Sequence, residues 1–319
     1  VERRETHMSW VFLTPRRAYK LKKPVRLEAV DLTDPAAREA YVREELRLNR
    51  RLAPSVYLDV LAVVRRNGGL ALGGRGEIVD WLLEMRRLPD AHMLENMIKE
   101  GQAGESHLRA VGETLAVFYA AQPSAGIATE AYRDRFVEEI ARSRQALEAH
   151  PDIVPPARVH ALAERLVTFL RYKSDLLAAR LPAVVDGHGD LRPEHVYLED
   201  PPAIIDCLDF SRRLRLVDPS DDLAFLAMEC ARMGAPWCEP ILLQTTGSAI
   251  RGGPAPPALR CFYKAVHAFI RARLAVLHIT RGDPRTPEKW PRQTRERLAL
   301  AEAHASALIP EARLSAPRH

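Results

Sequence analysis

The residues with the clearest chemical potential lie in two acidic motifs that follow each other closely. The first, DGHGDLRPEHVYL, begins at Asp186 and contains Asp190; the second, AIIDCLDF, begins at Ala203 and contains Asp206. The two inner aspartates are sixteen residues apart, and the short apolar pieces between them predict one small hairpin. Because such a hairpin is compact, we expect both carboxylates to converge on one spot.

Two converging carboxylates suit phosphoryl transfer. One carboxylate accepts the proton of an attacking hydroxyl group, and the other holds the magnesium ion that neutralises the phosphates. Taken alone, the four residues HGDL are equally compatible with a structural turn around a buried His188. The chemical interpretation therefore depends on the elements that the rest of the chain supplies.

Residues 1–87 are predicted to form a small sheet with one helix. The helix spans 35–53, with Asp34 as the expected N-cap and Pro35 at its first position. Its apolar arc contains one carboxylate, Glu45, whereas Arg43, Arg47, Arg50 and Arg51 lie opposite, so a carboxylate faces the core. Strand-favouring segments cover 7–14, 17–23, 56–64 and 77–85.

From about residue 90 the pattern changes to long helices. The helical patterns cover 91–100, 105–121, 130–148, 156–180, 219–233, 257–280 and 288–308, and only 183–210 interrupts them. The expected fold class is therefore α+β, with a small antiparallel sheet and one helix over 1–87 and a larger, mainly helical lobe over 88–319.

Composition and charge narrow the class of protein. The chain has 319 residues, of which 47% are hydrophobic and 28% charged, as in a soluble folded protein. Its net charge of +5 is too weak to imply a nucleic-acid partner. No apolar run approaches the roughly 20 residues of a membrane span. The cysteines show no CxxC spacing, so a reducing, cytoplasmic location is expected, without disulfides or structural zinc; they are Cys207, Cys230, Cys238 and Cys261.

The two acidic motifs resemble the catalytic loop and metal-binding segment of the protein-kinase-like fold in its aminoglycoside phosphotransferase form, whose pattern is H-G-D-L-x-x-x-N followed by I-D-x-x-D. The resemblance implies that His188 is the loop histidine, Asp190 the catalytic base and Asp206 the main magnesium ligand. The pattern's asparagine, a second magnesium ligand in that family, is His195 here. Magnesium prefers oxygen donors to imidazole donors, so the second metal position is in doubt. His195 is either a metal ligand or a hydrogen-bonded structural residue. Asp209 is a candidate to replace the missing oxygen ligand.

The same resemblance gives roles to the N-terminal residues. A kinase-like fold needs a strand lysine for the α- and β-phosphates and a helix glutamate that orients it. Ala18-Tyr-Lys20 resembles the Ala-x-Lys of that strand, and Glu45 is the inward helix carboxylate. Lys22 shares a strand face with Lys20, so strand alternation leaves both open as the phosphate lysine. We expect the Glu45 carboxylate within salt-bridge reach of one of them.

More narrowly, the segments ETHMSWVFLT, AYKLKKPV, EELRLNRRLAP, YLDV and DLAFL resemble the phosphotransferase half of bacterial proteins that join an aminoglycoside phosphotransferase-like half to a P-loop ATP-binding half. The similarity spans roughly residues 2–275, and no G-x-x-x-x-G-K-[ST] motif occurs in this chain.

This similarity implies further binding residues. A glycine-free turn from Glu5 to Ser9 would cover the phosphates, with Thr6 and Ser9 offering hydroxyl and backbone N–H groups. Asp222 would support the catalytic loop. The hinge whose backbone reads adenine would consist of Glu84, Met85, Arg86 and Arg87.

The sequence thus predicts an ATP-dependent phosphotransferase that uses ATP and Mg²⁺ to phosphorylate a hydroxyl of a small molecule, with the nucleotide on the N-terminal lobe and the substrate on the helical lobe. The competing hypothesis is a nucleotide-binding module with weak or no catalysis, motivated by His195 and the glycine-free turn. Phosphorylation of a protein or nucleic acid is disfavoured, because neither an activation segment nor a concentrated basic patch is recognisable. No membrane partner is expected, and the acceptor and oligomeric state do not follow from the sequence.

Overall fold

The computed structural model describes residues 1–6, 8–27, 30–280 and 288–308, which form two compact units. The expected lobe boundary after residue 87 falls inside the first unit, and this division stays a prediction. The first unit comprises Val1–Ala121, His188–Arg215 and Glu229–Thr246; the second comprises Gln122–Gly187, Leu216–Met228 and the described part of Gly247–His319.

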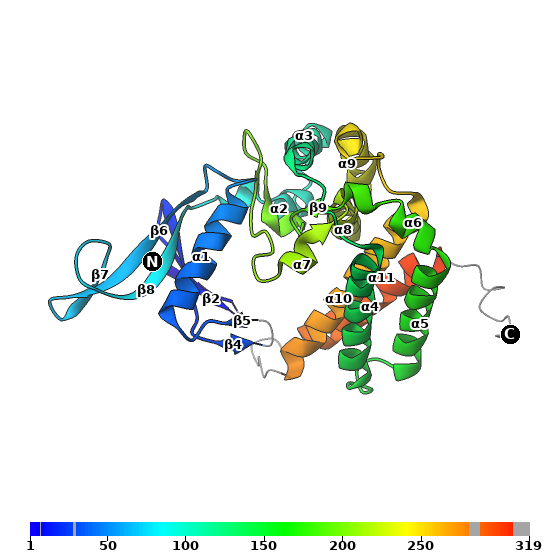
Figure 1. Cartoon of the computed structure of the whole chain (residues 1–319), viewed down its shortest axis with the longest axis horizontal. Coiled ribbons are helices and arrows are strands. Elements are labelled where there is room, and N and C mark those ends of the chain that lie inside the picture. Colours follow the sequence, from blue (N-terminus) through cyan, green and yellow to red (C-terminus); the bar gives the residue numbers. More distant parts are fainter. Residues whose placement is uncertain (7, 28–29, 281–287, 309–319) are drawn as a thin grey trace. The chain divides into compact units, whose positions relative to one another are not determined.

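The first unit contains a six-stranded antiparallel sheet in the order β1-β2-β3-β8-β6-β7 (Figure 1). All four predicted strands are confirmed, although His7 lies outside the described residues. The strands β1 and β7 were not predicted, because one is a short, wholly exposed run of charges and the other is only four residues long. The strands are β1 (Glu2–Glu5), β2 (Ser9–Leu13), β3 (Arg17–Lys22), β6 (Tyr57–Arg66), β7 (Gly69–Leu72) and β8 (Glu77–Arg86), beside a small hairpin of β4 (Arg26–Leu27) and β5 (Val30–Asp31).

Helix α1 (Pro35–Asn49) packs against β6 and β8 and begins at the proline, as predicted. Asp34 stands at the N-cap but makes no side-chain capping bond, and the helix ends at Asn49 rather than at residue 53. Its apolar arc is buried, and Glu45 on that arc is only 1% exposed. The expected inward carboxylate is therefore confirmed.

Short helices and hairpins complete the first unit. The predicted hairpin between the acidic motifs is present as β10 and β11, which pair antiparallel. Helix α9 was not predicted; it packs on α3, where a Cβ on Gly112 would lie 1.8 Å from Thr245 Oγ1, so only glycine allows this approach. The elements are α2 (Leu94–Lys99), α3 (Glu105–Ala121), β10 (Val196–Tyr197), β11 (Ala203–Ile204), α7 (Arg212–Arg215) and α9 (Cys238–Thr246), with 3-10 turns at Asp90–His92 and Pro193–His195.

The second unit is mainly helical. The predicted helix over 156–180 is interrupted at Lys173, which leaves α5 and α6. The helices of the second unit are α4 (Thr129–Glu148), α5 (Pro156–Tyr172), α6 (Ser174–Ala178), the first turns of α8 (Pro219–Arg232), α10 (Pro257–Thr280) and α11 (Lys289–Ser306). The unit also contains the paired strands β9 (Val185–Asp186) and β12 (Leu216–Val217), and 3-10 turns at Leu181–Ala183 and Gly247–Ala249.

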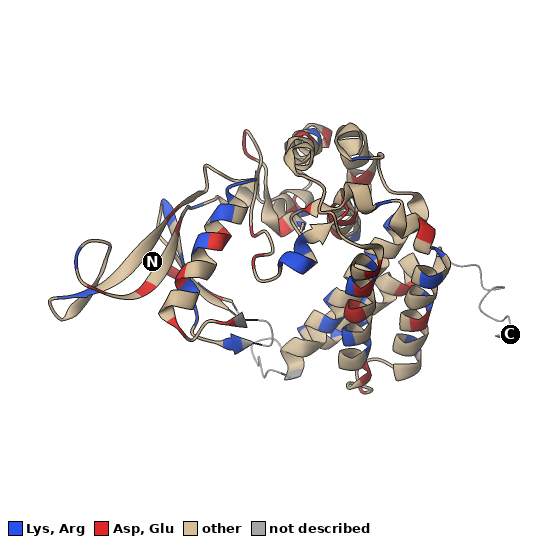
Figure 2. Cartoon of the chain, viewed as in Figure 1, with Lys and Arg blue, Asp and Glu red and all other residues tan. Residues whose placement is uncertain are grey.

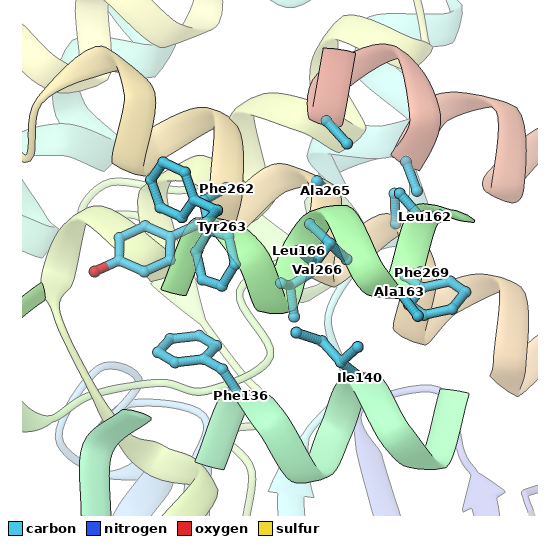
Figure 3. Packing of buried hydrophobic residues seen from close by; sticks show 14 of the residues in the cluster. Phe136, Ile140, Leu162, Ala163, Leu166, Phe262, Tyr263, Ala265, Val266 and Phe269 are labelled. Carbon is cyan, nitrogen blue, oxygen red and sulfur yellow. The ribbon is translucent and has the colours of Figure 1, made fainter. Parts of the chain in front are cut away.

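Aromatic side chains fill the core of this helical unit (Figure 3). The ring centroid of Phe262 on α10 lies 5.3 Å from that of Phe136 on α4 and 5.0 Å from that of Phe169 on α5. One aromatic residue thus joins three helices.

Asp222 is buried at the start of α8, and its role in supporting the catalytic loop stays a prediction.

Both signs of charge are interspersed along helix α4 (Figure 2), where Arg142 pairs with Glu139 at 3.0 Å. Within the described part of the chain, no helix combines the length and the apolar character needed to cross a membrane.

Candidate active site

The loop that carries Asp190 is held from within by His188, which is completely buried. The His188 Nε2 atom lies 2.9 Å from the carbonyl oxygen of Ile205, and the backbone N–H of Asp190 donates to His188 Nδ1 at 3.2 Å. A carbonyl oxygen only accepts, so Nε2 carries the proton and the ring is neutral. Gly189, at φ +81°, makes the turn between them. His188 therefore holds the loop in position through these two hydrogen bonds, and its side chain has no exposed surface for a substrate to contact.

Replacement of this histidine is expected to change the pH dependence of stability. Burial, together with the neighbouring His195, lowers the pKa of His188 from 6.5 to about 4. The unfolded chain therefore binds more protons between these pH values, and the stabilisation present above pH 6.5 is lost as the pH falls. We expect the wild type to lose about 2 kcal/mol through this group between pH 7 and pH 5.

Urea unfolding of His188→Gln at the two pH values tests this expectation, since glutamine retains an N–H donor and does not titrate. The exposed His160 offers a matched control, His160→Gln, which should keep the wild-type pH dependence. An unchanged pH dependence in His188→Gln would contradict the neutral, buried assignment.

The second acidic motif holds Asp206 in a left-handed backbone conformation, with φ 59°. This conformation is costly for a residue other than glycine and persists only where the surroundings impose it. The Asp206 N–H donates to the Tyr57 hydroxyl oxygen at 3.1 Å, and the N–H of Cys207 donates to Asn49 Oδ1 at 2.8 Å. Two side chains from the sheet and α1 thus fix the backbone that presents Asp206.

Neither Asn49 nor Tyr57 was predicted as a site residue. Asn49 follows Glu45 by four residues on the inward face of α1, so a polar residue on that face was a usable signal. Nothing in the strand pattern distinguishes Tyr57 from an ordinary core residue.

The two catalytic-motif carboxylates converge, as predicted, on opposite nitrogens of one imidazole. His195 Nδ1 lies 3.8 Å from Asp190 Oδ2, and His195 Nε2 lies 3.5 Å from Asp206 Oδ2. The same Nδ1 is 2.8 Å from the carbonyl oxygen of Asp190, which fixes the ring on the loop. The hydrogen-bonded reading of His195 is therefore observed, and its metal role stays a prediction.

Four further ionic contacts join strand β3 to α1 and to the second acidic motif. Lys20 Nζ lies 2.7 Å from Glu45 Oε1 and 3.1 Å from Asp206 Oδ1. Lys22 Nζ lies 2.7 Å from Glu45 Oε2 and 2.8 Å from Asp209 Oδ2. The expected ion pair of Glu45 is confirmed with both lysines, and Asp209 forms an ion pair with Lys22.

Burial and neighbouring charges set the protonation of this cluster. Burial disfavours the charged form of Lys20, but Asp206 and Glu45 outweigh it and raise the pKa of Lys20 well above its usual range. Lys20, above all, lowers the pKa of Asp206. The two lysines overcome the effect of burial on Glu45 and lower its pKa, whereas burial and Glu45 raise the pKa of Asp209. Asp206 is thus an anion at any physiological pH.

A cavity of about 260 Å³ opens beside this cluster within the first unit. Lys20, His195 and Asp206 line it, together with the ion pair of Arg4 and Asp90. Among the described lining residues Lys20 occurs and Lys22 does not, and the role of either as the phosphate lysine stays a prediction. Apolar side chains form much of the wall; they are Val11, Leu13, Ala18, Val56, Met85, Leu88 and Ile205.

The predicted hinge residues lie at the end of β8. Glu84 accepts a hydrogen bond from the Tyr19 hydroxyl, and Met85 lines the cavity. The Arg86 N–H already donates to Val56 O at 2.8 Å, and the N–H of Arg87 donates to Arg16 O at 3.0 Å. These two N–H groups are already engaged by backbone carbonyls next to the ends of β6 and β3.

The next residue, Leu88, lines the cavity, and no acceptor for its N–H is found among the described residues. The Leu88 N–H is therefore a further candidate beside the predicted hinge residues, whose role in base recognition stays a prediction.

The turn before β2 differs from its expected arrangement. Ser9 is buried, and its N–H donates to Thr6 Oγ1 at 3.0 Å. The Thr6 hydroxyl in turn donates to Ser9 O at 3.1 Å, and Thr6 lines the cavity. Of the two residues expected to cover the phosphates, Thr6 is the one at the cavity wall.

The donor set suits one magnesium ion shared with a phosphate ligand. In the described residues no group of three or more His, Cys, Asp or Glu side chains forms a cage for a metal. Magnesium is commonly held by one or two carboxylates, with phosphate oxygens and water completing its shell. Asp206 fits this requirement, because its carboxylate is 49% exposed at the cavity wall. Asp209, bound to Lys22, is less suitably placed, and its metal role stays a prediction.

No protein-family model matches the chain. Curated relatives include Rv2004c of Mycobacterium tuberculosis and Mb2027c of Mycobacterium bovis, both described as uncharacterized proteins. Each is 35% identical over 294 residues, which cover 89% of this chain. The chain spans only 56% of the length of these relatives.

Solved structures with a similar fold include choline kinases and an APH protein in complex with GDP and kanamycin. The choline kinase LicA from Streptococcus pneumoniae has a TM-score of 0.59 at 17% identity and covers 95% of this chain and 90% of its own. A choline/ethanolamine kinase family protein from Mesorhizobium loti has a TM-score of 0.56 at 17% identity, covering 96% and 88%. The GDP and kanamycin complex of APH(2")-IIia has a TM-score of 0.52 at 16% identity, covering 94% and 91%. The chain thus has the α+β, protein-kinase-like fold of these structures, as predicted.

Proposed function

We propose that this protein is an ATP-dependent phosphotransferase that transfers the γ-phosphate of ATP to a hydroxyl group of a small molecule. The proposal is supported chiefly by one arrangement: Asp190 and Asp206 face opposite nitrogens of His195. Lys20, paired with Glu45 and Asp206, lines the same cavity as Asp206. The names of the structurally similar proteins, which are choline kinases and an aminoglycoside phosphotransferase, support a small-molecule acceptor.

The nucleotide would be held by groups at the cavity. The apolar walls suit a planar base, and Leu88 N–H offers it a hydrogen bond. Lys20 would bind the α- and β-phosphates while Glu45 holds its ammonium group in place. Asp206 would hold a magnesium ion, which neutralises phosphate charge when bound.

Asp190 would act as the general base. Its carboxylate accepts the proton of the acceptor hydroxyl as that oxygen forms a bond to the γ-phosphorus. The bond from the γ-phosphorus to the bridging oxygen breaks, and ADP leaves with the electron pair. The products are the phosphorylated acceptor, ADP and one proton.

A panel of hydroxyl-bearing metabolites with ATP and Mg²⁺, scored by ADP release, tests the proposal. We expect at least one compound to raise ADP release above the rate without an acceptor. ATP binding without transfer to any compound would favour the alternative, a non-catalytic nucleotide-binding module.

The two strand lysines are expected to differ in their effects. Lys20→Met should weaken ATP binding by roughly 10- to 100-fold, because a hydrogen bond to a charged group contributes about 1.5–3 kcal/mol. Lys22→Met should instead lower the free energy of unfolding by about 3–5 kcal/mol, because it leaves Glu45 and Asp209 as buried anions with one cation fewer.

Calorimetric titration with ATP and urea unfolding measure the two effects. Lys23, which follows the strand and pairs with Glu5, provides a matched control; Lys23→Met should leave ATP affinity within about threefold of wild type, since an exposed pair contributes about 1 kcal/mol or less. A loss of ATP affinity in Lys22→Met without loss of stability would reverse the assignment.

A further inference from the structure

The guanidinium group of Arg192 lies among the charges of the catalytic loop. Its Nη2 atom is 2.9 Å from Asp190 Oδ2 and 3.0 Å from His195 Nε2, and its Nη1 atom contacts Glu194 Oε1. The side chain is only 13% exposed, and its buried Nε has no hydrogen-bond partner. A fixed positive charge is thus built into the loop beside the proposed base.

The contact between Arg192 and His195 leaves neither nitrogen of His195 free to bind a cation. Arg192 Nη2 can only donate, so the His195 Nε2 atom that it contacts is unprotonated and has a single lone pair, while Nδ1 donates to the carbonyl oxygen of Asp190. Arg192 Nη2 donates to that lone pair at 3.0 Å. A metal ion at His195 Nε2 would need the same lone pair, so the guanidinium and a metal ion exclude each other there.

We propose that Arg192 takes the place of a second metal ion, so that the protein binds its nucleotide with one divalent cation and neutralises the transferred phosphoryl group with the guanidinium. This inference rests on the proposed phosphotransferase function. It assigns the single metal to Asp206 and makes His195 the residue that orients Arg192.

The chemistry of the groups supports this assignment. A guanidinium is permanently charged and presents its donors in a planar fork that matches phosphoryl oxygens. Arg192 already spans Asp190 and His195, so it is pre-organised next to the atom that receives the acceptor proton. It exchanges no proton in the reaction; it shares its N–H donors between Asp190 and the phosphoryl group. Lys20, in contrast, contacts Glu45 and Asp206 and would serve the α- and β-phosphates.

Counting the bound metal ions tests the inference without relying on turnover. Mn²⁺ serves as the probe, and electron paramagnetic resonance measures Mn²⁺ bound in the presence of a non-hydrolysable ATP analogue. We expect one ion per wild-type chain. Arg192→Met frees His195 Nε2 and Asp190 Oδ2, so we expect it to bind a second ion. His195→Asn, which offers an amide oxygen in place of the ring nitrogen, should also admit a second ion.

The exposed Arg66 on strand β6 provides the matched control, and Arg66→Met should bind one ion. In a transfer assay, Arg192→Met should be slower by roughly 10²- to 10³-fold, as when one fixed donor to a developing negative charge is removed. Arg192→Lys should recover only part of this loss, because an ammonium group lacks the fork.

Two Mn²⁺ ions in the wild type would overturn the inference while leaving the proposed phosphotransferase intact. One ion in the wild type and in both variants would also overturn it, because Arg192 would then not be what excludes the second ion. A wild type without any nucleotide-dependent Mn²⁺ binding would contradict the proposed function together with the inference.

Discussion

Asp206→Asn is expected to remove the dependence of nucleotide binding on magnesium. Asparagine tolerates the left-handed backbone that this position requires, at φ 59°, so the loop should keep its shape. The amide lacks the negative charge that a hard cation needs, and it also releases Lys20, whose ammonium group contacts Asp206 at 3.1 Å. We therefore expect the affinity for Mg²⁺–ATP to fall by about 100-fold or more, since a lost contact to a charged group costs about 3 kcal/mol at the upper end.

Calorimetric titration of ATP with and without Mg²⁺ distinguishes a metal role from a general role in nucleotide binding. In Asp206→Asn the two affinities should become equal, and binding of metal-free ATP should be unchanged or tighter, because Lys20 is released. Asp209→Asn serves as the comparison, and it should retain the magnesium dependence. If Asp206→Asn still binds ATP more tightly with Mg²⁺, Asp206 is not the metal ligand.

Asp190→Asn is expected to leave nucleotide binding intact and to suppress transfer. A general base contributes roughly 10²- to 10⁴-fold to a rate and little to the affinity of the ground state. Asparagine can still accept the hydrogen bond that Arg192 donates to Oδ2, so the loop geometry should survive. Single-turnover transfer should therefore be slower by about 10²- to 10⁴-fold, with ATP affinity within about threefold of wild type.

The neighbouring Glu194 provides a control, because its carboxylate contacts the same guanidinium as Asp190. Glu194→Gln should reduce transfer by less than about tenfold, since it removes a contact to Arg192 but not the base. Equal losses in the two variants would mean that the carboxylates act by holding Arg192, and that Asp190 is not the base.

The fold was largely predictable from local patterns. Helix α1 and strand β3 have periodicities that place Glu45 inward and Lys20 on one strand face, and the two groups meet at 2.7 Å. The hairpin between the acidic motifs is formed by residues close in sequence, and it brings Asp190 and Asp206 close together. Where the periodic signal was weak, as in the four charged residues of β1 or the nine residues of α9, the elements were missed.

The remaining site residues depend on contacts between distant parts of the chain. Tyr57 supports Asp206 across 149 positions of the sequence, and Asn49 supports Cys207 across 158. No spacing rule connects such pairs. The predicted hinge shows a similar dependence on distant residues, because the N–H groups of Arg86 and Arg87 donate to the carbonyl oxygens of Val56 and Arg16. Arg192 was visible in the loop motif, but its function depends on the tautomer of His195, which only the hydrogen bonds reveal.

The proposed transfer of a phosphoryl group to a small molecule is tested most directly by following the γ-phosphate itself. ATP labelled at the γ-position is incubated with Mg²⁺ and a panel of hydroxyl-bearing metabolites, and the label is traced by chromatography and mass spectrometry, with Asp190→Asn as the matched control. We expect label in an organic phosphate ester with the wild type and a loss of about 10²- to 10⁴-fold with the variant. Label that stays in ATP or appears only as inorganic phosphate, equally in both proteins, would contradict the proposed transfer.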